Sequence, residues 1–134
     1  MRPRNRKEGA MIVTLIPVAL GGALGAVLRF LTVHGISRMV GNGFPLGTVV
    51  VNVAGSFAMG VLVSALTSKA PEWAAPLFLS GFLGGFTTFS AFSLDAIMLW
   101  ERGALLAAAG YVAASVIFSL AALLAGLFVA RQLL

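Results

Sequence analysis

The stretch Gly84-Gly85-Phe86-Thr87-Thr88-Phe89-Ser90-Ala91-Phe92-Ser93 lies in the middle of an apolar segment long enough to cross a membrane. It contains adjacent glycines and threonines, whose intrinsic helix preference is poor. Non-helical backbone at mid-membrane depth is tolerated only where it is buried in protein or lines a cavity. The stretch therefore predicts a break in a membrane helix, with a functional site at the break.

The composition is that of an integral membrane protein. The chain has 134 residues, of which 60% are hydrophobic and 10% charged, whereas a soluble domain carries about 25% charged residues. It has no cysteine, which excludes disulfides and thiolate metal sites. The single histidine, His34, lies near a predicted helix end, as solvated or interfacial residues do. Much of the net charge of +5 comes from a basic start to the chain, so we interpret residues 1–9 as a disordered basic tail attracted to anionic headgroups.

Four apolar segments each reach the roughly 20 residues that a membrane-spanning helix needs. They run from about Ala10 to Val33, Pro45 to Thr67, Ala74 to Trp100 and Ala104 to Arg131. The connections are short, so residues 10–134 are predicted to form one four-helix transmembrane domain, with the third and fourth helices as antiparallel neighbours. Without the basic tail, the Lys/Arg bias between the two sides nearly vanishes, and insertion in both orientations stays open.

Neutral polar side chains recur at helical spacing in three of the spans. The sets that share a face are Thr48, Asn52 and Ser56; Tyr111, Ser115 and Ser119; and Ser90 and Ser93. Hydrogen bonds between helices, worth about 0.6 kcal/mol each, account for any single serine. Burying the amide of Asn52 unpaired would cost at least about 1–3 kcal/mol. Three aligned stripes favour a polar lining of a pore, and hydrogen bonds between helices account for some members of each stripe.

Two charged residues lie near or within the apolar segments. Arg29 is close to the end of the first span, where it can snorkel to the interface or attract anions in a vestibule. Asp95 is one turn past the Phe/Ser cluster. We expect Asp95 to pair with an arginine, with Arg29 as the candidate, in a structural role.

These features exclude most classes of function. The spans hold no nucleophile–base constellation and no cluster for a catalytic metal. A proton-coupled transporter usually needs an ionisable group at mid-membrane depth, and the first span has no central glutamate. A passive pore or a structural membrane subunit remains. Four helices leave little space for a central pore, so a pore would form between subunits of a homo-oligomer. Its phenyl edges are positive and would hold a small anion weakly enough for it to leave.

The chain resembles the bacterial fluoride channels of the Fluc (CrcB) family. The matching residues are Gly21 to Phe30, Gly47 to Gly55 and Gly84 to Ser93. The likeness covers almost all of the chain, and the last of these motifs is highly specific.

The resemblance implies an all-α integral membrane protein of four transmembrane helices, the third broken at mid-membrane, that assembles as an antiparallel dual-topology homodimer. It implies a fluoride-selective channel, not an enzyme, with two pores per dimer and passive export of F⁻ across the bacterial inner membrane that confers fluoride resistance. The implied partners are the fluoride ion, the lipid bilayer and a second copy of the chain, with no nucleic acid. The alternative is a small structural or transporter-type four-helix subunit without fluoride conduction.

The resemblance also assigns roles to residues. Backbone carbonyls of Gly84 and Thr87 from both subunits would hold one structural Na⁺ at the dimer centre, in keeping with the preference of hard cations for oxygen ligands. Phe89 and Phe92 would face the pores, and Arg29 would stand at the aqueous vestibule. The polar track would be formed or supported by Asn52, Ser90, Ser93, Tyr111, Ser115, Ser119 and Thr48. The basic tail departs from this pattern, because it biases the topology of a chain expected to insert both ways.

Overall fold

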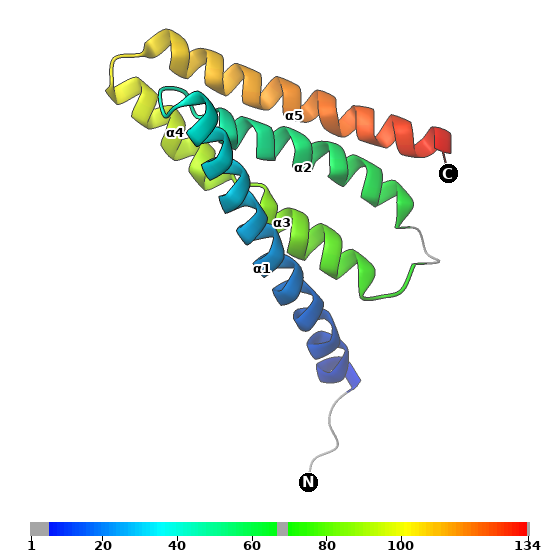
Figure 1. Cartoon of the computed structure of the whole chain (residues 1–134). Coiled ribbons are helices and arrows are strands. Elements are labelled where there is room, and N and C mark those ends of the chain that lie inside the picture. Colours follow the sequence, from blue (N-terminus) through cyan, green and yellow to red (C-terminus); the bar gives the residue numbers. More distant parts are fainter. Residues whose placement is uncertain (1–5, 67–69, 134) are drawn as a thin grey trace.

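The computed structural model describes residues 6–66 and 70–133, and the regular structure of these residues is helical (Figure 1). The elements are α1 (Arg6–Val40), α2 (Leu46–Ala65), the π-helix η1 (Pro76–Leu83), α3 (Gly84–Phe86), α4 (Phe89–Glu101) and α5 (Leu105–Leu133). Four stretches of the described residues are long and apolar enough to cross a membrane: Val13–Val40, Leu46–Ala65, Pro76–Glu101 and Leu105–Leu133. The four predicted spans are therefore confirmed.

The first helix is longer at both ends than its apolar segment. It begins at Arg6, inside the segment predicted as a tail, and the remainder of that prediction, residues 1–5, lies outside the described residues. It passes through Pro17 and ends where Gly41 takes a φ of 82° and donates its N–H to the Ser37 carbonyl at 2.9 Å. A hydrogen bond and a left-handed glycine end this helix. The boundary that hydropathy placed at Val33 therefore lies before the true end at Val40.

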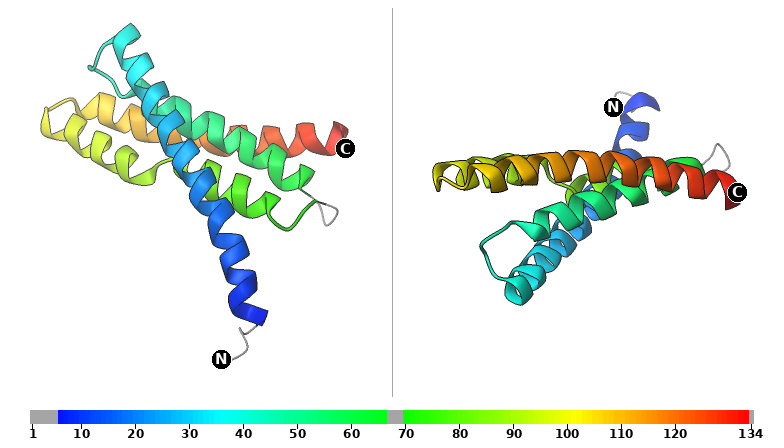
Figure 2. Two further views of the ribbon diagram at one scale, coloured as in Figure 1. Left: turned by 60° about the horizontal axis from the view of Figure 1, so that its bottom comes forward. Right: turned by 90° about the horizontal axis from the view of Figure 1, so that it is seen from above.

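Close backbone contacts hold the helices together. Helices α2 and α5 run side by side, and a Cβ at Gly126 would collide with the carbonyl oxygen of Phe57 on α2. Helix α1 crosses η1 and α3, where a Cβ at Gly25 would collide with the Phe82 carbonyl oxygen. Figure 2 shows α1 lying obliquely across the other helices, with its N-terminal part leaving the bundle. Small residues at such crossings are the usual means by which membrane helices approach closely.

Few side chains are fully buried within the single chain. Tyr111, Leu83 and Val51 are the largest of the described residues that are, and most large apolar side chains are exposed. Lipid tails or another protein must cover such a surface, because contiguous apolar area of this extent is not stable in water. The chain is therefore a multi-pass membrane protein.

Candidate functional site

The hydrogen-bond ladder of the third span is interrupted between Phe86 and Phe89. Thr87 has φ −83° and ψ 159°, and Thr88 has φ −152° and ψ 123°, so both are extended. β-Branched threonine suits this backbone. The N–H and the hydroxyl of Thr87 both donate to the Leu83 carbonyl at 2.9 Å. Thr88 then caps α4, because its Oγ1 accepts the N–H of Ala91 at 3.1 Å.

The side chain of Asn52 on α2 replaces the missing backbone partners of Thr88. Its Nδ2 donates to the Thr88 carbonyl at 3.0 Å, and its Oδ1 accepts the Thr88 N–H at 2.8 Å. An amide has one further N–H donor. Asn52 therefore satisfies the interrupted backbone and retains a donor for another ligand.

The carbonyls of Gly84 and Thr87 are affected because the N–H groups that would bond them in a helix bond side chains instead. In a continuous helix, the N–H of Thr88 would bond the Gly84 carbonyl and the N–H of Ala91 would bond the Thr87 carbonyl. Here these two N–H groups are engaged by Asn52 Oδ1 and Thr88 Oγ1. Neither carbonyl receives the donor that a continuous helix supplies, so both oxygens suit a hard cation.

A groove of about 400 Å³ lies beside the interruption, between α2, α4 and α5. Its lining residues are Asn52, Gly55, Ser56, Met59, Thr87, Thr88, Phe89, Phe92, Ser115, Val116, Ser119, Leu120 and Leu123. None of these described residues is charged. The groove thus brings together five residues of the predicted pore set, namely Asn52, Phe89, Phe92, Ser115 and Ser119.

The aromatic rings form a row that leads out of this groove. Phe89 is 79% exposed, and its ring centroid lies 5.5 Å from that of Phe92. Phe92 lies 5.5 Å from Tyr111, which is fully buried and forms a T-shaped pair with Phe44 at 5.7 Å. Phe92 is thereby held by its neighbours, whereas Phe89 projects from the protein.

Two predicted pore serines have other partners. The Ser93 hydroxyl donates to the Phe89 carbonyl of its own helix at 2.9 Å, a common back-bond for serine in helices. Ser90 Oγ lies 3.4 Å from Thr88 Oγ1. Neither residue lines the groove in the single chain. Ser115, by contrast, is 5% exposed, and its hydroxyl has no hydrogen-bond partner among the described residues.

Among the described residues, Asp95 forms no ion pair with an arginine, and its partners are hydroxyl groups instead. Its Oδ2 accepts hydrogen bonds from the Thr48 hydroxyl at 2.7 Å and from the Tyr111 hydroxyl at 3.3 Å. Asp95 thus joins α2, α4 and α5 through two hydroxyl donors. The helical spacing of Thr48 and Tyr111 predicted that they belong to polar stripes. Their hydroxyls instead donate hydrogen bonds to Asp95, which lies 47 and 16 residues away in sequence.

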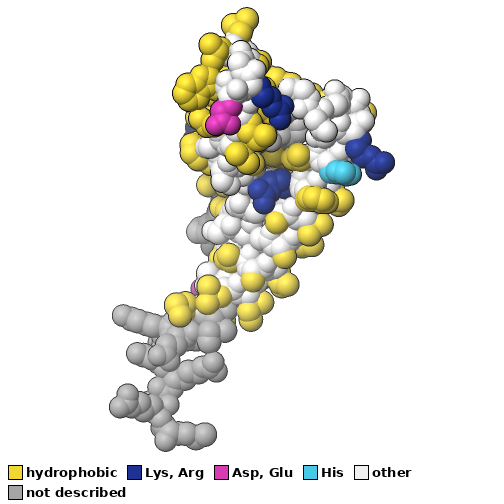
Figure 3. Space-filling model, turned by 90° about the vertical axis from the view of Figure 1, so that its left-hand side faces the viewer, with side chains coloured by type: hydrophobic (Ala, Val, Ile, Leu, Met, Phe, Trp, Pro, Cys, Tyr) yellow, Lys and Arg dark blue, Asp and Glu magenta, His cyan; other side chains and the backbone are white. Residues whose placement is uncertain are grey.

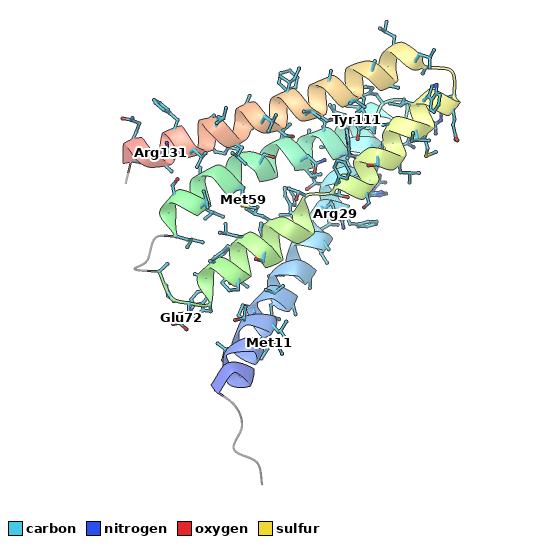
Figure 4. The ribbon with its side chains drawn as sticks, turned by 180° about the vertical axis from the view of Figure 1, so that it is seen from behind. Met11, Arg29, Met59, Glu72, Tyr111 and Arg131 are labelled. Carbon is cyan, nitrogen blue, oxygen red and sulfur yellow. The ribbon has the colours of Figure 1, made fainter. Side chains whose placement is uncertain are left out.

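Arg29 and Thr48 line a second pocket, of about 390 Å³, at the other side of the interruption. It is bounded by α1, Asn42 in the connection to α2, and the start of α4. Figure 4 shows Arg29 on α1 beside the region where α3 gives way to α4, with Tyr111 on α5 farther along the bundle. Thr88 lines both the groove and this pocket, so the interrupted backbone forms part of the wall of each cavity.

Sequence reasoning missed the role of Thr88. A Ser or Thr immediately before a helical segment is an N-cap signal, and this signal was present in the Thr87-Thr88 pair. The aliphatic members of the groove wall carry no local signal at all, because their place follows from how α2 and α5 pack. They are Met59, Val116, Leu120 and Leu123.

Comparisons with known proteins identify the family of the chain. A family model described as "CrcB-like protein, Camphor Resistance (CrcB)" matches residues 16–127. The chain belongs to the CrcB family. A Cereibacter sphaeroides relative named "Fluoride-specific ion channel FluC" is 57% identical to this CrcB chain over 121 residues, which cover 90% of the chain and 97% of the relative. Relatives of the same name from Chelativorans sp. (57%, 90% and 98% covered) and Paracoccus denitrificans (52%, 90% and 96% covered) are similarly close.

Proposed function

We propose that the protein is a passive fluoride channel that exports F⁻ from the cytoplasm and confers fluoride resistance. The observation that carries this proposal is the uncharged groove of phenyl rings, hydroxyls and an amide beside the interrupted third span. The relatives named fluoride-specific ion channels, which match the chain over nearly its whole length, support fluoride as the ion. Fluoride enters cells as neutral HF, dissociates in the cytoplasm and is driven out by the membrane potential.

The lining suits a strongly hydrated anion that must exchange its water stepwise. Asn52 retains an N–H donor, and Ser115 and Ser119 add hydroxyls from α5. Phe89 and Phe92 offer ring edges, which are the positive part of the phenyl quadrupole. Because no lining residue of the described groove is a cation, the anion is bound weakly enough to leave, as conduction requires.

A second copy of the chain completes the pathway in this proposal. The groove is open on one side in the single chain, and Phe89 at its rim is 79% exposed. Lipid is a poor cover for this region, because irregular backbone is excluded from contact with hydrocarbon. An antiparallel dimer would close the groove of each copy, which gives two pores, and would place the interruption of the third span at mid-membrane.

The carbonyls of Gly84 and Thr87 are the proposed ligands of a structural Na⁺ at the dimer centre. The fit rests on the two diverted donors, Thr88 N–H to Asn52 and Ala91 N–H to Thr88 Oγ1. Two carbonyls from each copy would supply four oxygens, which suits a hard monovalent cation. The ion would neutralise the partial negative charge at the C-terminal end of α3 and join the two copies.

Fluoride flux from liposomes tests the proposed function. The purified full-length protein is reconstituted in vesicles loaded with potassium fluoride or potassium chloride, and valinomycin starts efflux. We expect rapid loss of fluoride and retention of chloride, with protein-free vesicles as the control. Equal loss of both anions would overturn the selectivity. Retention of both, together with failure to rescue a fluoride-sensitive strain at good expression, would favour the structural-subunit alternative.

Removal of Na⁺ tests the proposed cation. Exchange of Na⁺ for N-methylglucamine should lower the thermal stability of the detergent-solubilised dimer and slow fluoride flux, and restored Na⁺ should reverse both effects. The physical reason is that the clustered carbonyls of Gly84 and Thr87 would then face one another without a cation. Unchanged stability and flux after exhaustive exchange would contradict the site.

A further inference from the structure

Gly55 is a buried residue of α2 that lies against the interrupted backbone. A Cβ at this position would overlap the Cγ2 methyl carbon of Thr87 and would lie 3.3 Å from Phe86 Cδ1. Gly55 is three residues beyond Asn52, so the two share a face of α2. That face contacts both threonines of the interruption, because Asn52 hydrogen-bonds Thr88 and Gly55 leaves room for the methyl group of Thr87.

The side chain of Thr87 is held in one orientation. Its hydroxyl and its N–H both donate to the Leu83 carbonyl oxygen at 2.9 Å. A β-branched side chain has few accessible χ1 angles, and a rotation that moves Cγ2 away from Gly55 would break the hydroxyl bond to Leu83. A larger residue at position 55 would therefore displace the backbone of Thr87, and its carbonyl would move with it.

Charged side chains do not supply the ligands of the proposed cation site. Helices α2, η1 and α3 carry no charged residue, and on α4 Asp95 accepts the hydroxyls of Thr48 and Tyr111. Figure 3 shows the Arg and Lys side chains of one face gathered toward one end, with mostly hydrophobic or uncharged atoms over the rest of the described surface. Affinity for a cation then depends on where the carbonyls of Gly84 and Thr87 are held.

We propose that Gly55 is a positioning residue of the structural cation site. The space left by its missing side chain holds the Thr87 methyl group, and this contact fixes the Thr87 carbonyl where it can bind Na⁺. The proposal rests on the proposed Na⁺ site and adds to it a residue of α2, outside the interrupted span. Because ligand groups have to be held within about 0.5 Å of their productive positions, Gly55→Ala should weaken Na⁺ binding.

The test follows thermal unfolding of the full-length protein in detergent while Na⁺ replaces N-methylglucamine at constant ionic strength. A ligand that binds only the folded protein raises the melting temperature above a concentration near its Kd. The onset of this rise therefore reports the affinity for Na⁺. Gly55→Ala should need at least about tenfold more Na⁺ than wild type to reach the onset, which corresponds to a loss of roughly 1.4 kcal/mol.

Gly60→Ala is the matched control. Gly60 is also a buried glycine of α2, and a Cβ there would overlap the Leu123 carbonyl oxygen on α5. The variant thus creates a similar collision that does not involve Thr87. It should lower the melting temperature at every Na⁺ concentration and leave the onset at the wild-type value.

Thr87→Ser tests the contact itself, because serine lacks the methyl group and keeps the hydroxyl. In the Thr87→Ser background, Gly55→Ala should leave the onset where Thr87→Ser alone has it. The remaining neighbours of the added carbon lie at 3.3 Å for Phe86 Cδ1 and 3.7 Å for Thr87 Cβ. If Gly55→Ala alone does not fold, recovery of folded protein in the double variant supports the contact, and a double variant that also fails to fold overturns it.

A wild-type onset in Gly55→Ala would overturn the proposal. An equal shift in Gly60→Ala, or an equal effect of Gly55→Ala in both backgrounds, would overturn it as well. Failure of the Na⁺ site looks different, since the melting temperature of wild type would then not depend on Na⁺, and the proposal would fall with the site. Failure of fluoride conduction is distinct again, because wild type would respond to Na⁺ and show no fluoride flux from liposomes.

Discussion

At the scale of single residues, Asn52 determines whether the interrupted backbone keeps its shape. We expect Asn52→Ala to destabilise the protein by about 1–3 kcal/mol, because the N–H and carbonyl of Thr88 lose both partners. Fluoride flux should fall with it. Asn52→Asp keeps an acceptor for the Thr88 N–H but sets a carboxylate oxygen against the Thr88 carbonyl oxygen, so it should destabilise the protein at least as much as Asn52→Ala. Thermal unfolding in detergent and liposome flux measure both effects. Wild-type behaviour of Asn52→Ala would contradict the role of this amide.

Phe89 and Phe92 differ in how they are held, and this difference separates two effects of mutation. Phe89→Ile should cut fluoride flux at least about tenfold without loss of stability, since a lost contact of roughly 1.4 kcal/mol is a factor of ten and Phe89 is 79% exposed. Phe92→Ile should cut flux and also lower stability, because its ring contact with Tyr111 is lost.

Phe118→Ile, on the exposed surface of α5 and outside the groove, is the matched control and should conduct like wild type. Size-exclusion chromatography checks that each variant keeps its oligomeric state. Full flux in both Phe89→Ile and Phe92→Ile would remove the ring edges from the mechanism.

At the scale of helices, the contact between α2 and α5 depends on glycine. We expect Gly126→Ala to destabilise the protein by about 1–3 kcal/mol, because the added Cβ would collide with the Phe57 carbonyl oxygen and push the helices apart. Gly110→Ala in the same helix is the matched control. A Cβ there meets nothing within 4 Å, so the change should be neutral or stabilising by up to about 1 kcal/mol. Equal thermal stability of the two variants would contradict close packing at Gly126.

Hydropathy was enough to place the four spans, because each helix is apolar over the length that a bilayer demands. The pair Gly84-Gly85 followed by Thr87-Thr88 marked the weak part of the third span, because these residues have poor helix preference. Nothing comparable in the sequence marks the π-helical turns of η1. The partners of Asn52 and Asp95 were also out of reach, since Thr88 is 36 residues from Asn52 and Thr48 is 47 residues from Asp95. Such pairs follow from how helices cross, which periodicity within one helix does not encode.

At the scale of the whole molecule, the open groove makes a second copy of the chain the central expectation, and its orientation can be measured. The chain has no cysteine, so Gln132→Cys near the C-terminal end of α5 introduces a unique label site. Because glutamine is neutral, the Lys/Arg bias that sets topology stays unaltered. We expect a membrane-impermeant maleimide to label about half of the protein in intact cells and the remainder after permeabilisation, as an antiparallel pair of identical chains requires. Labelling from one side alone would contradict dual insertion. It would indicate that the basic residues at the start of the chain determine its orientation.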